Sequence, residues 1–461
     1  MGAHTKLTEN KMGTMPLTRL IINMALPMVI AMLVQALYNV VDSIYVSHID
    51  GGEAVTALSL AFPVQNIMIG FATGIGVGVN ALLSKSLGEG DQKTANRAAG
   101  NGFFLVAVAT VLFALFGILG TRPFFEMQNV SAATAEGGIV YTSICCVFAV
   151  GVFVEILGER LLQASGRTVY TLITQGVGAV LNILLDPVFI FGVEWLGIPA
   201  MGIAGAAIAT VIGQWVAAIL ALIFNFKCNP EVQLRLRDLI PSGQVIGKIL
   251  TVGVPSIIMV AIGSVMNFSM NQILLGFEGI GETSASVFGI YFKLQSFFFM
   301  PLFGLNNGTV SIVAFNYGAR KPERITGTLK RSCTIALGVM VVGLLVFQLL
   351  PDMLLGIFNP TDEFLHIGRN ALRKISLAFP MAAIGIALTA GFQALGNGTY
   401  STIISLCRQM IVLLPAAYFL SLTGDVTNVW WAFPIAETAS VMVTLLFFLR
   451  IYKRKIKPLS E

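Results

Sequence analysis

The chain has 461 residues, of which 56% are hydrophobic and 11% are charged. Apolar runs of about twenty residues or more follow one another from end to end and leave no room for a soluble domain between them, which is typical of a polytopic membrane protein. The formal net charge of +5 predicts contact with anionic lipid at one membrane face, and no nucleic-acid partner is expected.

Along the chain, the hydropathy pattern predicts an all-α membrane protein with twelve transmembrane helices. The polar first residues give no sign of a cleavable signal peptide. Most Lys and Arg fall in loops that share one side, so we expect both termini in the cytoplasm, although Arg122, Arg369, Arg373 and Lys374 break this pattern. The predicted spans are 17–47, 54–84, 95–120, 138–163, 168–192, 201–226, 246–276, 283–313, 326–350, 366–394, 399–422 and 428–451.

The sequence also repeats itself. Pro27 and Asn39 recur 228 positions later as Pro255 and Asn267, and after a two-residue shift the offset becomes 230. The later pairs are Gln65 and Gln295, Gly74 and Gly304, Gly78 and Gly308, Gly88 and Gly318, Gln163 and Gln393, Gly166 and Gly396, and Tyr170 and Tyr400. Six helices per copy is an even number, so the repeat predicts two parallel six-helix bundles with pseudo-twofold symmetry. We place them at 1–237, with its cytoplasmic linker, and at 238–461.

The first predicted helix carries a polar stripe. Gln35, Asn39 and Asp42 recur at helical spacing, so they share one face of an otherwise apolar segment. A carboxylate at mid-span costs roughly 2.5–3.5 kcal/mol on insertion scales. Asp42 is therefore predicted to face the protein interior and to have a functional role, whereas the two amides could also hydrogen-bond between helices.

A second group of polar residues falls on the fifth and sixth predicted helices. Asn182 and Asp186 are one turn apart, as are Ala206 and Thr210. Pro187 predicts an irregularity at Asp186, because the residue before a proline avoids the α conformation. Carboxylate, amide and hydroxyl groups suit a proton or Na⁺ and do not suit a soft transition metal. A polar knot that only fixes helix packing is the alternative interpretation.

Five segments occur in the order typical of one transporter family: Leu26–Pro27, Tyr38–Asp42, Leu87–Gly90, Leu181–Pro187 and Gly205–Thr210. With Phe315–Ala319 in the second half, they make the whole chain resemble the MATE (multidrug and toxic compound extrusion) family, and its bacterial MepA-type branch in particular. The resemblance implies a cation site made by Asp42, Asn182, Asp186, Ala206 and Thr210. It also implies a secondary antiporter that exports hydrophobic or cationic drugs and dyes in exchange for H⁺ or Na⁺, without a cofactor. We expect a monomer in the lipid of a prokaryotic inner membrane.

The second half does not repeat the acids. At the repeat offsets Asp42 corresponds to Met270, Asn182 to Val412 and Asp186 to Ala416, so we expect ion coupling in the first half. Arg408 is predicted to pair with Glu437, or else to line the cavity. Residues predicted to line a substrate cavity are Gln35, Asn39, Gln65, Met259, Met266, Lys293 and Gln295.

Three other functional classes fit the sequence less well than export. A flippase for lipid-linked oligosaccharides or polymers of the same superfamily would need several cavity cations to hold a pyrophosphate, and only Lys293 and Arg408 are candidates. An intramembrane enzyme would need a nucleophile–base or metal pair, and a channel would need a repeated filter segment. The sequence shows neither feature. We interpret Gly74–Gly78 as a site of close helix packing, and the five cysteines as packing residues.

Overall fold

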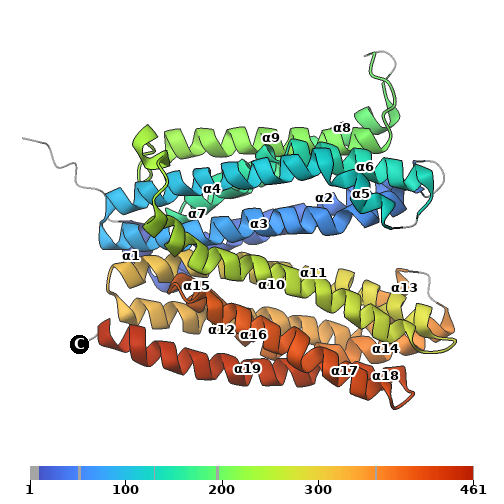
Figure 1. Ribbon diagram of the computed structural model, residues 1–461. Helices are drawn as coiled ribbons and strands as arrows, with labels where there is room; N and C mark the ends of the chain where they lie inside the picture. The colour runs from blue at the N-terminus through green and yellow to red at the C-terminus, as the bar shows by residue number, and fades with distance from the viewer. Residues whose placement is uncertain (1–9, 50–52, 129, 194–196, 359–360, 460–461) are drawn as a thin grey trace, which may run out of the picture. The chain divides into compact units, whose positions relative to one another are not determined.

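The computed structural model describes residues 10–49, 53–128, 130–193, 197–358 and 361–459. Within these ranges the chain is helical apart from short connections, and one isolated antiparallel bridge joins Val193 and Ile198. In Figure 1 the long helices of each part of the chain run side by side.

Contacts group the chain into two compact units. The first comprises Met1–Gly13 with Ile30–Ile257, and the second comprises Thr14–Val29 with Ile258–Glu461. Three helices, α1, α2 and α10, therefore contribute residues to both units. The predicted domains, 1–237 and 238–461, follow the order of the chain and not its contacts, so that division stays a prediction.

The helices of the first half are α1 (Lys11–Thr14), α2 (Leu17–Ser47), α3 (Glu53–Glu89), α4 (Gln92–Leu119), α5 (Thr121–Glu126), α6 (Ala132–Val147), α7 (Val150–Ala164), α8 (Thr168–Phe191), α9 (Ile203–Cys228) and the 3₁₀ turn η2 (Leu236–Leu239). Those of the second half are α10 (Gly243–Leu275), α11 (Gly281–Gly318), α12 (Pro322–Leu349), α13 (Pro351–Gly356), α14 (Asp362–Ser376), α15 (Phe379–Ala394), α16 (Gly398–Leu406), the π-helical turn η3 (Cys407–Leu413), α17 (Leu414–Ser421), α18 (Val426–Val429) and α19 (Ala432–Ile451), which continues through η4 (Tyr452–Ile456) and η5 (Lys457–Leu459).

Among the described residues, ten helical segments are long and apolar enough to cross a membrane. Two bent helix pairs, α6 with α7 and α14 with α15, bring the number of spans to as many as twelve. This agrees with the twelve predicted spans and with an all-α membrane protein.

Two of the predicted spans, 138–163 and 366–394, are each divided into two helices by a bend that the hydropathy pattern did not predict. The chain bends by 47° between α6 and α7 and by 48° between α14 and α15, at corresponding places in the two halves. At the first bend the carbonyl of Phe148 accepts from the Trp215 indole at 3.2 Å and from the Gly151 amide at 3.3 Å. At the second, a proline follows the first residue of α15 and has no amide to donate.

Glycines that recur in the repeat let helices approach closely in both units. In the first unit, a Cβ added to Gly74 would lie 2.7 Å from the Gly253 carbonyl oxygen on α10. In the second unit, one added to Gly304 would lie 2.8 Å from the Val29 amide nitrogen on α2. The glycine-rich stretch of α3 is therefore a helix-packing surface, as predicted.

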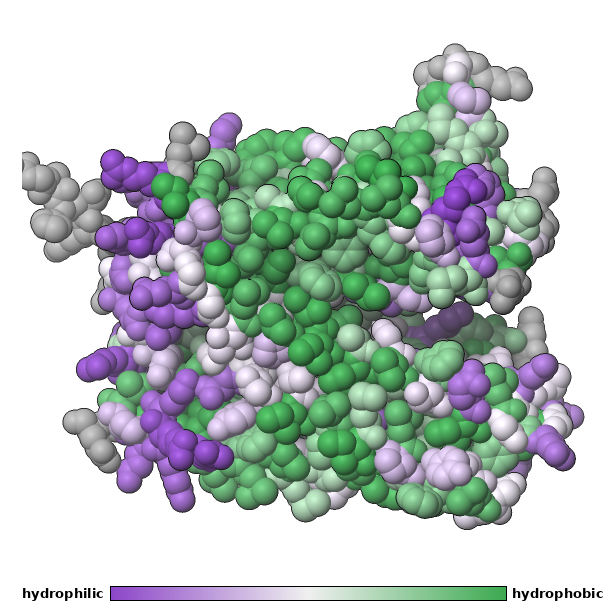
Figure 2. Space-filling model, in the orientation of Figure 1, coloured by the Kyte–Doolittle hydropathy of each residue, from purple (hydrophilic) through white to green (hydrophobic). Residues whose placement is uncertain are grey.

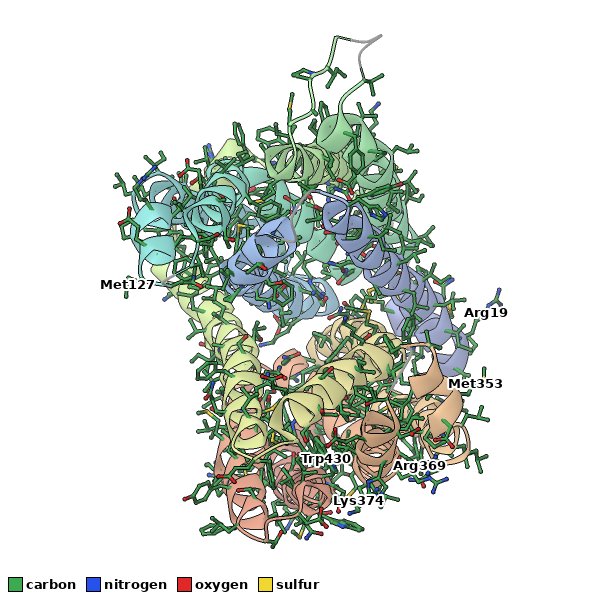
Figure 3. All side chains as sticks on the ribbon, turned by 90° about the vertical axis from the view of Figure 1, so that its right-hand side faces the viewer. Arg19, Met127, Met353, Arg369, Lys374 and Trp430 are labelled. Carbon is green, nitrogen blue, oxygen red and sulfur yellow. The ribbon has the colours of Figure 1, made fainter. Side chains whose placement is uncertain are left out.

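In each unit, apolar side chains cover the middle of the visible face and polar ones gather toward the helix ends (Figure 2). Two of the cations that break the predicted charge pattern have acidic partners. Arg122 lies 4.0 Å from Glu126 and 3.9 Å from Glu136, and Arg369 lies 2.8 Å from Asp352. Arg369 and Lys374 are at the rim of the second unit in Figure 3, where Lys374 donates to the Thr427 carbonyl at 2.7 Å.

Candidate functional site

The helix pair α8 and α9 holds four of the five predicted cation-site residues. Small residues bring the two helices together, since a Cβ added to Gly213 would lie 2.8 Å from the Gly178 carbonyl oxygen. One turn beyond Gly178, Asn182 therefore comes opposite Thr210. Helix α8 runs without a break through Pro187 to Phe191, so the predicted irregularity at Asp186 was wrong. Pro187 still has no N–H, which leaves the carbonyl four residues earlier without its helical donor.

Asn182 links the two helices by hydrogen bonds. We orient its amide by its partners, because oxygen and nitrogen can be told apart only by their hydrogen bonds. Its nitrogen then donates to Asp186 Oδ2 at 3.2 Å, and its oxygen accepts from the hydroxyl and the backbone N–H of Thr210, both at 3.2 Å. Asn182, Asp186 and Thr210 are all buried, and so is Ala206, one turn before Thr210. Asp186 itself has no exposed surface.

Asp42 on α2 completes the group, because its carboxyl lies within hydrogen-bonding range of Asp186. Two carboxyl groups can share a hydrogen bond only when one of them carries a proton. Asp42 Oδ1 is a buried atom with no hydrogen-bond partner. The site thus combines two carboxyls, an amide oxygen and a hydroxyl with one free acceptor, a set of hard ligands that fits a proton or Na⁺.

Further polar residues lie near the acids, and of these only Gln65 was among the predicted site residues. Gln65 on α3 donates to the Tyr141 hydroxyl at 3.0 Å and to Cys145 Sγ at 3.8 Å. Tyr38 lies within electrostatic range of both Asp42 and Asp186. Tyr38 precedes Asp42 by one helical turn, so helical spacing could have identified it. Tyr141 has no such signal, because it meets Gln65 only through the packing of α6 on α3.

The predicted substrate-cavity residues fall on different elements. Gln35 is exposed on α2, and Asn39 lies on the same helix with its side chain outside the described residues. Met259 is half-buried and Met266 is buried on α10, whereas on α11 Lys293 is exposed and Gln295 is half-buried. Only Gln65 takes part in the hydrogen bonds described above. That these seven residues line one cavity stays a prediction.

Charged side chains also lie elsewhere within the helices. On α7, Glu159 accepts from the Thr174 hydroxyl at 2.7 Å and from the Gln175 amide at 2.8 Å, and Arg160 donates to Gln163 at 3.0 Å. In the second unit, an Arg408 Nη lies 3.3 Å from Glu437 Oε1. The predicted pairing of Arg408 with Glu437 is confirmed.

Comparison with known proteins identifies the family. The MatE family model matches residues 27–188 and 255–419, once in each half of the chain. The multidrug export protein MepA of Staphylococcus aureus (strain MSSA476) is 24% identical over 461 residues, with 97% of this chain and 96% of that protein aligned.

Two solved structures extend this likeness to the fold. A MATE protein in complex with MaL6 superposes with a TM-score of 0.90 at 25% identity, covering 98% of this chain and 99% of the other. An outward-facing multidrug resistance MATE family transporter of the MOP superfamily gives a TM-score of 0.89 at the same identity and coverage. The chain is thus an integral membrane protein that belongs to the MatE family, as a MATE transporter of the MepA type.

Proposed function

We propose that this protein is a secondary active multidrug exporter that expels hydrophobic or cationic compounds in exchange for H⁺ or Na⁺. Family membership supports the reaction class, and the similar MepA protein is a multidrug export protein. We infer a transporter and not an enzyme, active as a monomer. Its proposed location is the inner membrane of a prokaryote, with both termini in the cytoplasm.

The observation that carries this proposal is the pair of carboxyls, Asp42 and Asp186, inside the first unit. An acid within a membrane-spanning helix is costly and is kept where an ion must bind. Asn182, which is itself bonded to Thr210, donates to Asp186 on one side, while Asp42 Oδ1 has no donor. A proton or Na⁺ would neutralise the pair and take that free acceptor as a ligand.

Coupling then follows from differential affinity. An ion that binds more tightly in one conformation than in the other shifts the population toward that conformation, and a drug with the opposite preference shifts it back. Helix α2, which carries Asp42, contains Pro27, and a proline inside a helix permits a bend there. We propose that ion binding at Asp42 changes the shape of α2 through this proline.

Transport in proteoliposomes tests the proposal. The purified protein is reconstituted, and ethidium movement is followed while a proton gradient or a Na⁺ gradient is imposed separately. We expect one gradient to drive ethidium against its concentration difference. If neither gradient drives any member of a broad dye and drug panel, export is excluded, and translocation of a fluorescent lipid-linked sugar would then support the flippase alternative.

A further inference from the structure

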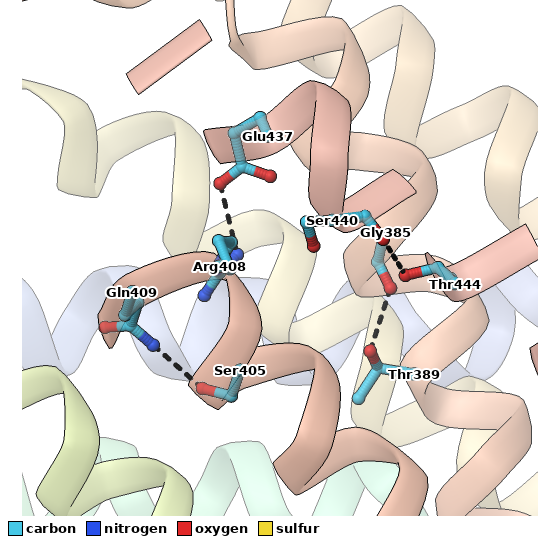
Figure 4. Close-up of polar contacts among 8 residues, drawn as sticks. All are labelled: Gly385, Thr389, Ser405, Arg408, Gln409, Glu437, Ser440 and Thr444. Carbon is cyan, nitrogen blue, oxygen red and sulfur yellow. Dashed lines mark hydrogen bonds and ion pairs between the residues drawn. The ribbon is translucent and has the colours of Figure 1, made fainter. Parts of the chain in front are cut away.

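The ion pair of the second unit lies outside the coupling site. Arg408 lies in η3, where a π-helical turn widens the backbone between α16 and α17, and Glu437 lies on α19 (Figure 4). The side chains are 28% and 14% exposed. Single π-helical turns inside α-helices are rare and occur frequently at functional sites.

The internal repeat gives this pair a counterpart. At the offset of 230 residues, Arg408 corresponds to Gly178, Glu437 to Ala207 and Ser440 to Thr210. Segment α16–η3–α17 with α19 is therefore the counterpart of α8 with α9, which hold the candidate cation site. The same helix pair has a charged group in each half, but the charges differ.

The pair is incomplete. One nitrogen of Arg408 contacts one oxygen of Glu437, although guanidinium and carboxylate groups often form two parallel hydrogen bonds. The second carboxylate oxygen, Glu437 Oε2, is buried without a hydrogen-bond partner, and the buried Trp430 indole nitrogen also has none. An orphaned acceptor on a charged group in a membrane is expensive, so Arg408 leaves the carboxylate incompletely satisfied and open to another cationic partner in its place.

Aromatic residues lie near the carboxylate. Phe433 precedes Glu437 by one turn of α19, and its ring centre lies 6.0 Å from those of Phe288 and Tyr291. Tyr291 lies within electrostatic range of both Glu437 and Arg408. The faces of such rings attract cations, most strongly where water is excluded.

We propose that Glu437 binds a lipophilic aromatic monocation, which replaces Arg408 as the partner of the carboxylate. The inference rests on the proposed export function, for which it names a substrate site. Exchange of one monocation for another leaves the charge of the site unchanged. Arg408 is partly exposed, and its long stem allows the guanidinium to turn toward water while the aliphatic part stays on apolar surface.

Binding measurements on the full-length protein in lipid nanodiscs test this site, with ethidium as the cationic probe and Nile red as the neutral one. In Glu437→Gln we expect ethidium affinity to fall by about tenfold or more, because a partly desolvated charge partner is lost, while Nile red affinity stays constant. In Arg408→Gln we expect ethidium to bind more tightly, because its competitor is gone. Ethidium affinity within twofold of wild type in Glu437→Gln, or an equal fall for both probes, would overturn the proposal.

A double variant guards against misfolding of the single ones. Arg408→Gln with Glu437→Gln replaces the ion pair by two amides that can hydrogen-bond to each other, so no unpaired charge is buried. It should fold and show the same loss of ethidium affinity as Glu437→Gln, and wild-type affinity in it would refute the site. A wild-type protein that binds no probe would contradict the export function as well, whereas unchanged binding by both glutamate variants would contradict this inference alone.

Discussion

Two helix pairs related by the internal repeat each hold a carboxyl group within the membrane, but its partners differ between the two units. In the first unit, α8 and α9 hold Asp186 among neutral hydrogen-bonding groups, with Asp42 beside it. In the second unit, the corresponding pair holds Glu437 against Arg408. The first carboxyls need a cation from solution, whereas the second has one supplied by the chain. This difference explains why we assign ion coupling to the first unit.

The packing of the two halves has diverged much less than their polar residues. Both have a bent fourth helix, and both use glycines at corresponding positions to bring helices into contact. The bends and the close glycine contacts are thus common to both halves, whereas the polar residues differ. The two halves therefore offer matched variants, in which one substitution is made at corresponding positions.

The largest effect is expected from the acids of the first unit. Asp42→Asn and Asp186→Asn should each abolish ethidium export driven by an ion gradient, because each removes a carboxyl that the ion needs. The double variant should lose little more export activity than either single variant, because the two carboxyls act as a unit. Uptake by proteoliposomes containing equal amounts of protein measures this. Export at the wild-type rate by Asp42→Asn would place coupling elsewhere.

The matched control is Met270, which occupies the repeat position of Asp42. Met270 has no exposed surface, so truncation to alanine would leave a cavity, whereas Met270→Leu conserves volume. This variant should export ethidium like the wild type. If it loses export as completely as Asp42→Asn, the two units share the coupling role and the contrast between them fails.

A glycine pair compares packing in the two units. A Cβ on Gly78 would overlap the Ile249 carbonyl, whereas one on Gly308 would make its nearest contact at 3.4 Å, with the Ala25 amide nitrogen and the Met24 Cβ. Gly78→Ala should therefore destabilise the protein by about 1–3 kcal/mol through overpacking, and Gly308→Ala should cost less than about 0.5 kcal/mol. Thermal unfolding in detergent measures the stability of both variants. An equal loss of stability in the two would show that the helices adjust equally to the added methyl group.

Hydroxyl groups at corresponding positions give a smaller contrast. Thr210→Val removes the hydroxyl that bonds to Asn182, so we expect the ion concentration for half-maximal export to rise by about tenfold. Ser440→Ala removes the corresponding hydroxyl of the second unit and should leave this concentration unchanged. Export measured over a range of ion concentrations distinguishes the two. An equal change in both variants would mean that the effect is not specific to the coupling site.

Sequence reasoning located the helices and proposed the candidate coupling residues for a physical reason. Membrane helices need long apolar runs, so a residue such as Asp186 stands out from its surroundings. Helical spacing then placed Asn182 beside Asp186, and Ala206 beside Thr210, on common faces. That α2 would bring Asp42 to this helix pair followed from the family resemblance and not from the residues.

Tertiary features without a local signal were missed. The bend after α6 lies within an uninterrupted apolar run, and the indole of Trp215 that contacts it comes from α9. The π turn at Arg408 likewise leaves the hydropathy pattern unchanged, because it alters the winding of the helix and not its composition. The contact of Gln65 with Tyr141 depends on how α3 packs against α6.

The loop that follows the bent fourth helix also differs between the halves. In the first unit, the Ser165 carbonyl accepts from the Asn10 amide at 3.3 Å, and Asn10 also donates to both oxygens of Glu231 at 2.8 Å. In the second unit, the corresponding carbonyl, that of Leu395, accepts from Lys455 Nζ at 2.6 Å. One contact thus depends on a carboxylate and the other on an ammonium group.

The smallest predicted effect is the pH dependence of the contact at Glu231. Burial raises the pKa of Glu231 above its ordinary 4.5, and this outweighs the opposing influence of Arg167, Asn10 and Lys11. The folded state therefore favours the protonated acid. The stabilising contribution of protonated Glu231 is complete below pH 4.5 and is lost as the pH rises through the elevated pKa. Amide hydrogen exchange at residues 10–14, corrected for the intrinsic rate at each pH, should accordingly show less protection at pH 7 than at pH 4.

Glu231→Gln provides the decisive comparison for this contact. The glutamine resembles the protonated acid and keeps an oxygen that can accept from Asn10, so its protection should not change between pH 4 and pH 7. The amides of residues 395–397 in the second unit serve as an internal reference, because the Leu395 carbonyl accepts from an ammonium group, Lys455 Nζ. In the wild type we expect faster corrected exchange at pH 7 than at pH 4, because burial raises the pKa of Glu231. The same pH trend in Glu231→Gln would show that another group controls the contact.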